Sequence, residues 1–220
     1  MIQGILFDLD ETLLDRTASL NRFLHEQHTR YQTHFQEIPF VTFQSRFHSL
    51  DEKGYVHKRV VYQKLLAEWQ IKGLTFEELL EDYQQGFRHH VSGFDNWRAV
   101  LTELRQRSYR LGIITNGETE FQQRNMDAMM LPELVDTILI SQHENLRKPD
   151  PQIFERAAER LGVAPADCLF VGDHPANDIA GARNAGMRTV WFANSFAWPD
   201  DLPRADHEID SLNELFDILS

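Results

Sequence analysis

The sequence predicts an α/β fold, built from a parallel sheet with helices on both faces and an inserted α-helical domain. A short apolar run, Ile2–Phe7, has the character of a buried strand and ends abruptly at Asp8. Residues 15–91 then show helical periodicity without a convincing strand. After this stretch, strand-like and helix-like segments alternate, which is typical of a parallel sheet covered on both faces. We therefore expect an α/β core from residues 1–14 and 92–220, interrupted by a helical insert.

The insert carries four predicted helices, which we expect to form a small bundle. Pro39 stands at the start of the second helix, where its fixed φ suits the first turn. Thr75, followed three residues later by Glu78, forms a capping box that predicts the start of the fourth helix. The apolar residues that share a face in the four helices are Leu20, Phe23 and Leu24; Phe40, Phe43, Phe47 and Leu50; Val61, Leu65, Leu66 and Trp69; and Phe76, Leu79, Leu80, Tyr83 and Phe87.

The chain after the insert supplies the remaining strands and the helices between them. Asp150-Pro151 marks the start of one helix and Gly162 its end, because Pro favours the first helical position and Gly the residue after the last turn. Ser211 and Glu214 predict the start of a final helix. The expected strands are 110–115, 135–140, 168–171 and 189–193, and the expected helices lie around 97–104, after 117, at 151–161, at 175–185 and after 211.

Composition narrows the range of partners. A hydrophobic fraction of 42% with 11% aromatic residues is enough for a folded core. A formal net charge of −12 disfavours nucleic acid and anionic membranes, because both bind positive surfaces. Cys168 is the single cysteine, which excludes an internal disulfide and, at the head of an apolar run, predicts a buried thiol. With no signal peptide and no membrane span in the sequence, we expect a cytoplasmic protein, as a monomer or a homodimer.

Two aspartates one residue apart follow the first predicted strand. Because side chains alternate along an extended chain, Asp8 and Asp10 should project to the same side. Two charged carboxylates side by side repel each other unless they share a proton or bind a cation. A plainer interpretation is that one aspartate caps a helix and the other lies in a turn. The pair alone therefore does not decide the function.

Three further polar clusters fall at or just after the ends of predicted strands. They are Thr115-Asn116-Gly117, Arg147-Lys148-Pro149-Asp150, and the segment from Gly172 to Asp178. In an open parallel sheet these strand ends share one edge, where ligands bind. Each cluster taken alone is well explained as a turn, an exposed loop or a helix start. Their joint occurrence after the aspartate pair favours one common site.

On these residues the chain resembles the haloacid dehalogenase (HAD) superfamily, in the subgroup whose helical cap follows the first strand. The four motifs of that family are matched in order by Asp8, Asp10 and Thr12; by Thr115; by Lys148; and by Asp173 and Asp178. The resemblance covers about residues 1–14 and 92–195 and implies a Rossmann-like core. The stretch from Ile114 to Pro149 is also similar to the family's pyrimidine 5′-nucleotidases, within a subgroup that resembles phosphoglycolate phosphatase. Glu11 stands where the family most often has glycine.

The resemblance implies roles for the acidic residues. Asp8 would attack phosphorus and form an aspartyl-phosphate, and Asp10 would protonate the leaving oxygen and later take a proton from water. Mg²⁺ would be held by the carboxylates of Asp8 and Asp173 and by the backbone carbonyl of Asp10. Thr12 would orient Asp10 through a hydrogen bond. Asp178 would orient the site lysine or a metal-bound water.

The resemblance also implies a phosphate-binding group. The Thr115 hydroxyl and the backbone N–H groups of Asn116 and Gly117 would hold phosphoryl oxygens, beside the fixed positive charge of Lys148. An acidic site that receives an anionic phosphate needs both this lysine and the metal ion to balance its charge.

These expectations describe a Mg²⁺-dependent phosphatase that hydrolyses a small soluble phosphate monoester, for instance a nucleoside monophosphate. The helical insert would close over the substrate as a cap. A phosphomutase and a 2-haloacid dehalogenase have the same implied fold and stay open as alternatives, although dehalogenation needs neither a metal nor a general acid. A catalytically idle binding module is the alternative outside the enzymes, and it is disfavoured because every expected catalytic position is filled.

Overall fold

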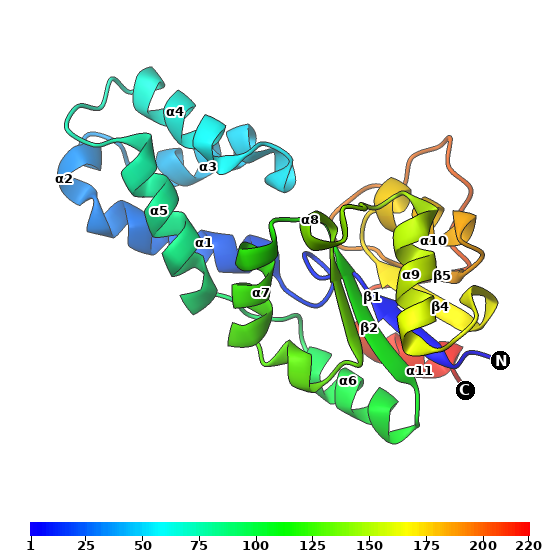
Figure 1. Ribbon diagram of the computed structural model, residues 1–220. Coiled ribbons are helices and arrows are strands. Elements are labelled where there is room, and N and C mark those ends of the chain that lie inside the picture. The colour runs from blue at the N-terminus through cyan, green and yellow to red at the C-terminus, as the bar shows by residue number, and fades with distance from the viewer. The chain divides into compact units, whose positions relative to one another are not determined.

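A computed structural model describes the whole chain, Met1–Ser220. The chain divides into two compact units, which we call the core unit and the helical unit. The core unit consists of Met1–Arg16 and Ser92–Ser220, and the helical unit consists of Thr17–Val91. Figure 1 shows the helical unit in colours that run from blue through cyan to green. None of the helices has both the length and the apolar character needed to cross a membrane.

The core unit is built on one sheet of six strands that are all parallel, in the order β3-β2-β1-β4-β5-β6. The apolar run at the start of the sequence forms β1, which pairs with β2 on one side and β4 on the other. The predicted parallel α/β fold is therefore confirmed. The strands are β1 (Gly4–Phe7), β2 (Arg110–Thr115), β3 (Thr137–Ile140), β4 (Cys168–Gly172), β5 (Arg188–Phe192) and β6 (His207–Ile209).

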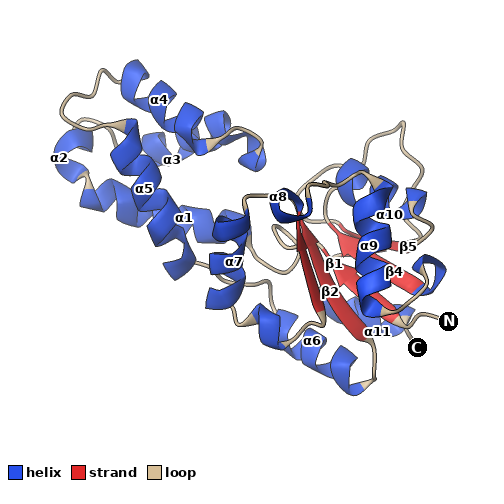
Figure 2. Ribbon diagram, in the orientation of Figure 1, coloured by secondary structure: helices blue, strands red, loops and turns tan.

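Helices cover both faces of this sheet, shown in blue around the red strands in Figure 2. The helices of the core unit are α6 (Trp97–Gln106), α7 (Thr119–Ala128), α8 (Ser141–Glu144), α9 (Pro151–Leu161), α10 (Gly181–Asn184) and α11 (Leu215–Ile218). On one face α9 packs against β1, β2 and β3, and α10 packs against α9. Phe154 of α9 meets Phe170 of β4 edge to face, with ring centres 5.0 Å apart. This packing fixes the start of α9, and with it the loop that precedes that helix.

The helical unit has a core of its own, made largely of aromatic side chains. Phe43, Phe47 and Tyr62 are fully buried, and the rings of Phe47 and Tyr62 lie 5.5 Å apart. The predicted capping box is present, because the Thr75 hydroxyl accepts from the Glu78 N–H and the Glu78 carboxylate accepts from the Thr75 N–H. The helices are α1 (Arg16–Arg30), α2 (Gln32–Phe35), α3 (Phe40–Asp51), α4 (Lys58–Glu68) and α5 (Phe76–Gly86).

Several elements differ from the expectation, among them the four-residue helices α2 and α8, which were not predicted. The segment 175–185, expected as one α-helix, is a π-helix over Pro175–Ala180 followed by α10. The ring of His174 accepts the first free N–H groups of this segment, and the Ile179 N–H reaches back five residues to the His174 carbonyl (3.4 Å). Strand β6 was not predicted, because it has only three residues and two of them are exposed.

The strand order decides where polar side chains can meet. β1 lies between β2 and β4, so the residues that follow these three strands lie beside one another at one edge of the sheet. The chain order reverses between β1 and β4, and open parallel sheets bind ligands at such a point.

Candidate active site

The first aspartate of the predicted pair lies at the centre of this edge. Asp8 follows β1 directly, and its backbone N–H donates to the carbonyl of Val171 in β4 (2.9 Å). Strand pairing therefore continues up to Asp8, and only 7% of the residue is exposed. A carboxylate on such a rigid element is well placed to act on a bound substrate.

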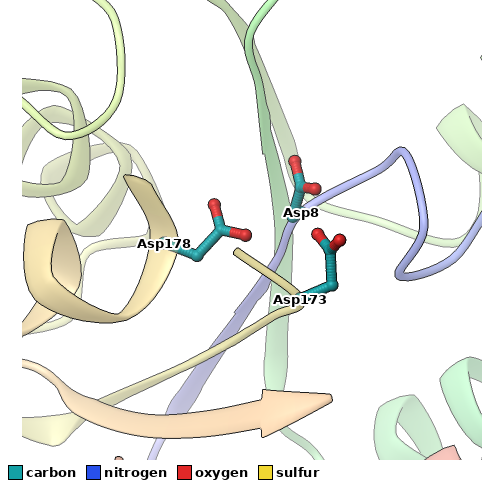
Figure 3. Close-up of side chains that lie close together, drawn as sticks. All are labelled: Asp8, Asp173 and Asp178. Atoms are coloured by element: carbon teal, nitrogen blue, oxygen red, sulfur yellow. The ribbon is translucent and has the colours of Figure 1, made fainter. Parts of the chain in front are cut away.

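Two more aspartates lie next to Asp8. Asp173 follows β4 and Asp178 lies in the π-helix, and oxygens of the three carboxyl groups lie within 4.8 Å of one another. Figure 3 shows Asp8 beside Asp173 and Asp178, which come from the segment that follows β4. Gly172 permits this approach, because a Cβ atom at that position would lie 2.6 Å from the Cβ of Asp178.

Lys148 supplies positive charge to the three aspartates. Its buried ammonium group donates to Asp8 Oδ1 (2.5 Å) and to Asp178 Oδ1 (2.7 Å). Burial alone would lower the pKa of Lys148, but the negative charges of Asp178 and Asp8 outweigh burial and raise this pKa above its ordinary value. Lys148 is therefore positively charged at neutral pH. Asp178 contacts Lys148 directly, which the expected role of Asp178 in orienting this lysine requires.

The three carboxyl groups can carry more negative charge than the single Lys148 ammonium group can balance. Burial raises the pKa of Asp8 to about 7, with Asp178 and Asp10 adding repulsion against the attraction of Lys148. Burial, together with repulsion from Asp178 and Asp8, raises the pKa of Asp173 to about 10. A divalent cation bound by these oxygens would relieve that repulsion, and hard carboxylate oxygens are the ligands that Mg²⁺ prefers. The donor set therefore fits a divalent metal.

The segment that ends β2 is tied to the loop that carries Lys148. The Lys148 backbone N–H donates to Asn116 Oδ1, and Asn116 Nδ2 donates to the Lys148 carbonyl, at 3.0 Å each. Thr115 is the last residue of β2 and is buried beside this pair. The Asn116 side chain thus holds Lys148 in place, a role that the sequence analysis did not assign to it.

The expectation for Gly117 needs correction. Its backbone N–H, which we expected to bind phosphate, donates to the Ser141 hydroxyl at 3.0 Å and already has an acceptor. Gly117 is needed here because it has no side chain. A Cβ atom at this position would lie 2.8 Å from Cγ of Gln122 and would clash with it. The absence of a side chain at Gly117 lets Gln122 approach the end of β2.

The expectation for Thr12 is also wrong. Its hydroxyl is buried and has no hydrogen-bond partner, so it does not orient Asp10. The turn after β1 explains this, because the Thr12 N–H bonds back to the Leu9 carbonyl (3.3 Å) and the side chain enters the protein interior. Asp10 is held instead by Gln122, whose Nε2 donates to Asp10 Oδ2 at 2.8 Å.

Gln122 and Trp191 are the site residues that the sequence analysis missed. Gln122 lies on α7, and Trp191 of β5 donates from its ring nitrogen to the Asp173 carbonyl (2.8 Å). The sequence offers one signal for Gln122, because it stands four residues before Met126 and a helix that buries Met126 also turns Gln122 inward. A buried amide needs polar partners.

His174 lies inside the fourth motif but has a structural role. Its ring nitrogen Nδ1 accepts from the N–H groups of Ala176 and Asn177 at 3.1 Å each, and its ring packs on Phe196. These contacts fix the start of the π-helix, whose Asp178 in turn accepts from the His174 N–H (2.9 Å). His174 thereby helps to hold Asp178 beside Lys148.

Known proteins resemble this chain over most of its length. A family model described as haloacid dehalogenase-like hydrolase matches residues 5–192, which include the strand ends and the helical unit. A phosphoserine phosphatase from Thermus thermophilus is 29% identical over 96% of this chain and 97% of the relative. A glyceraldehyde 3-phosphate phosphatase from Pyrococcus abyssi is 32% identical over 87% of this chain and 82% of the relative.

A solved structure shows the same fold over the whole length. The HAD-hydrolase YfnB from Bacillus subtilis, solved bound to magnesium, superimposes with a TM-score of 0.75 and 25% sequence identity. The match covers 100% of this chain and 99% of that structure. The family model and the phosphatases among the relatives therefore show that the chain belongs to the haloacid dehalogenase-like hydrolases, as a phosphoric monoester hydrolase.

Proposed function

We propose that the protein is a Mg²⁺-dependent phosphatase that hydrolyses a small phosphate monoester through an aspartyl-phosphate on Asp8. The observation that carries this proposal is the buried contact of Asp8 with Lys148 at the end of β1, beside Asp173 and Asp178. A nucleophile, a fixed cation and further oxygen ligands are what phosphoryl transfer requires of a protein.

In the first step, an Asp8 oxygen attacks phosphorus and the bond from phosphorus to the ester oxygen breaks. Asp10 gives its proton to the leaving oxygen, so that the product departs as a neutral alcohol. In the second step, water attacks the phosphorus of the aspartyl-phosphate while Asp10 takes a proton from that water. The bond from phosphorus to the Asp8 oxygen then breaks, inorganic phosphate leaves and Asp8 is regenerated. The two steps together consume one water for each ester.

Mg²⁺ would be held by the carboxylates of Asp8 and Asp173 and by the backbone carbonyl of Asp10, with Asp178 beside them. When bound, it would neutralise charge that develops on the phosphoryl oxygens. The raised pKa values of Asp8 and Asp173, caused by burial and by repulsion from neighbouring carboxylates, support this assignment, because a bound cation would offset both effects. The magnesium-bound structure of YfnB supports the choice of metal.

The phosphoryl group would be held by the Thr115 hydroxyl, the Asn116 backbone N–H and the Lys148 ammonium. All three lie on segments joined by the reciprocal hydrogen bonds of Asn116 and Lys148. Donors fixed in advance stabilise developing charge without having to reorganise during the reaction.

We assign the helical unit, Thr17–Val91, the role of a cap over the substrate. Such an insert favours small phosphorylated metabolites over protein substrates. The relatives named for phosphoserine and glyceraldehyde 3-phosphate point to the same size class, and the likeness of Ile114–Pro149 to nucleotidases adds nucleoside monophosphates to it.

The test is hydrolysis of p-nitrophenyl phosphate with Mg²⁺ and after removal of metal by EDTA. We expect Mg²⁺-dependent release of nitrophenol, and no release by the Asp8→Asn variant, which should keep the wild-type circular dichroism spectrum. A panel of phosphoserine, glyceraldehyde 3-phosphate, phosphoglycolate and nucleoside monophosphates then ranks substrates. Chloride release from 2-chloropropionate serves as the control for dehalogenase chemistry. Undiminished turnover by Asp8→Asn, or no turnover of any phosphate ester with Mg²⁺, would overturn the proposal.

A further inference from the structure

One buried glutamine contacts both the acidic and the phosphate-binding side of the site. The Nε2 atom of Gln122 donates to Asp10 Oδ2 at 2.8 Å and to the Thr115 hydroxyl oxygen at 2.7 Å. The Gln122 residue is 2% exposed. An amide nitrogen carries two hydrogens, so these two contacts use its full donor capacity.

Several neighbours fix the orientation of this amide. Asn125, one turn further along α7, donates from Nδ2 to Gln122 Oε1 (3.5 Å). A flipped amide would place its oxygen against an Asp10 carboxylate oxygen, where two acceptors would repel. Gly117 leaves room for the Gln122 side chain, as described above. The arrangement therefore has one favourable orientation.

The contact with Thr115 sets the direction of its hydroxyl. Because Thr115 Oγ1 accepts from Gln122, the hydroxyl hydrogen has to point to another acceptor. In the proposed site that acceptor is a phosphoryl oxygen, so Gln122 keeps Thr115 as a hydrogen-bond donor toward the substrate.

The contact with Asp10 makes its two carboxylate oxygens different from each other. The N–H of Gln122 occupies Oδ2, which leaves Oδ1 as the oxygen that can reach a leaving group. Asp10 can act as the proposed general acid only if this oxygen is held in a fixed position, and the contact with Gln122 provides that position.

We infer that Gln122 is a positioning residue that links the general acid to the phosphate-binding threonine. This inference rests on the proposed phosphatase function. It predicts that the loss of Gln122 harms substrates that need acid assistance more than substrates that do not.

The leaving group makes this inference testable. Nitrophenolate departs as a stable anion without a proton, whereas an alkoxide needs one from the general acid. We expect Gln122→Met to lower kcat/KM for an alkyl phosphate such as glycerol 3-phosphate by about 100-fold and for p-nitrophenyl phosphate by less than about 10-fold. We also expect the inhibition constant of inorganic phosphate to rise by about 10-fold through the freed Thr115.

Gln123→Met is the matched control, because Gln123 is the next residue of α7 and its amide bonds only to Asp127 at the surface. It should leave both substrates at wild-type rates. If Gln122→Met does not fold, Gln122→Leu also removes both amide N–H donors without placing a charge beside Asp10, and it should show the same selective loss.

Equal losses on the two substrates, or no loss on either, would overturn the inference and leave the proposed function intact. A wild-type protein that hydrolyses neither ester with Mg²⁺ would sink the proposed function itself, so the two failures are distinguishable.

Discussion

A single lysine connects three segments of the chain at the residue scale. Its ammonium group meets Asp8 after β1 and Asp178 in the π-helix, while its backbone is paired with the side chain of Asn116 after β2. Removal of Lys148 would take away the charge that we propose binds the substrate phosphate, and would leave two buried carboxylates without their counterion.

We expect Lys148→Ala to raise the inhibition constant of inorganic phosphate by about 10- to 100-fold, because a hydrogen bond to a charged group contributes about 1.5–3 kcal/mol. Competitive inhibition of p-nitrophenyl phosphate hydrolysis measures this constant. Lys64→Ala on the exposed surface of α4 is the control and should leave the constant unchanged. An unaltered inhibition constant in Lys148→Ala would show that Lys148 does not bind phosphate.

The sequence was sufficient to bring the four motifs to one sheet edge, but not to assign every hydrogen bond. Asp8, Lys148, Asp173 and Asp178 meet because alternating elements predict a parallel sheet, whose strands all end at the same edge. The partner of Asp10 could not be predicted, because it depends on how the turn after β1 directs the Thr12 side chain. The positions of the strand ends can be predicted from the sequence pattern alone. Side-chain contacts between elements can be identified only in the folded structure.

At the element scale, α8 and α9 are clamped together on either side of the loop that carries Lys148. The Glu144 carboxylate at the end of α8 accepts from Arg156 (2.9 Å) and Arg160 (2.8 Å), which lie one turn apart on α9. The Glu144 side chain is 3% exposed, so these contacts are shielded from water on one side. The clamp limits the movement of the loop between the two helices.

This clamp predicts a dependence of stability on pH. Burial would raise the pKa of Glu144, but the hydrogen bonds of Arg160 and Arg156 outweigh it and lower this pKa below its ordinary value of 4.5. A lowered carboxyl pKa stabilises the folded protein above about pH 4.5, and this contribution is lost as the pH falls through the folded pKa.

We therefore expect Glu144→Gln to lower the free energy of unfolding by about 1 kcal/mol at pH 7, since the arginines are partly exposed and solvent screens the contact. Urea denaturation at pH 7 and at progressively lower pH checks this value. The difference between wild type and variant should shrink below pH 4.5, and a difference that stays constant with pH would contradict the assignment. Glu159→Gln, an exposed change on α9, is the control.

Prediction of the elements was most reliable where caps and apolar periods agreed. Arg110–Thr115 and the helix that begins at Pro151 and is followed by Gly162 match their expected bounds. The π-helix was not predictable, because the periodic pattern does not distinguish the five-residue bond from Ile179 N–H to the His174 carbonyl from the four-residue bonds of an α-helix. Short edge strands such as β6 bury too little apolar surface to leave a signal.

At the scale of the whole molecule, the helical unit is one continuous stretch of chain with a core of its own. Its buried residues include a polar network, in which the Tyr62 hydroxyl donates to Gln27 Oε1 (2.9 Å) and Gln27 Nε2 donates to the Leu79 carbonyl (3.1 Å). Three of its helices are thus joined by satisfied buried hydrogen bonds as well as by aromatic packing.

We expect a fragment of residues 17–91 to fold without the core unit. Far-ultraviolet circular dichroism should show a helical spectrum and a cooperative thermal transition. Phe43→Ala in the same fragment should abolish that transition, because loss of a buried phenylalanine costs about 3–5 kcal/mol. A wild-type fragment that melts without cooperativity would show that the helical unit depends on the rest of the chain.

The central place of β1 has a consequence for the newborn chain on the ribosome. Gly4 pairs with Arg110 and with Cys168, so β1 is synthesised more than a hundred residues before either of its neighbours exists. At about 5–20 residues per second this wait lasts roughly 5–30 seconds, during which an apolar strand is open to association with other chains.

Asp8 and Asp10 follow that strand directly and are charged while the chain is unfolded. Charges that flank an apolar strand suppress its aggregation. The carboxylates proposed to cleave phosphate esters in the finished protein would therefore first protect the strand that carries them during its synthesis.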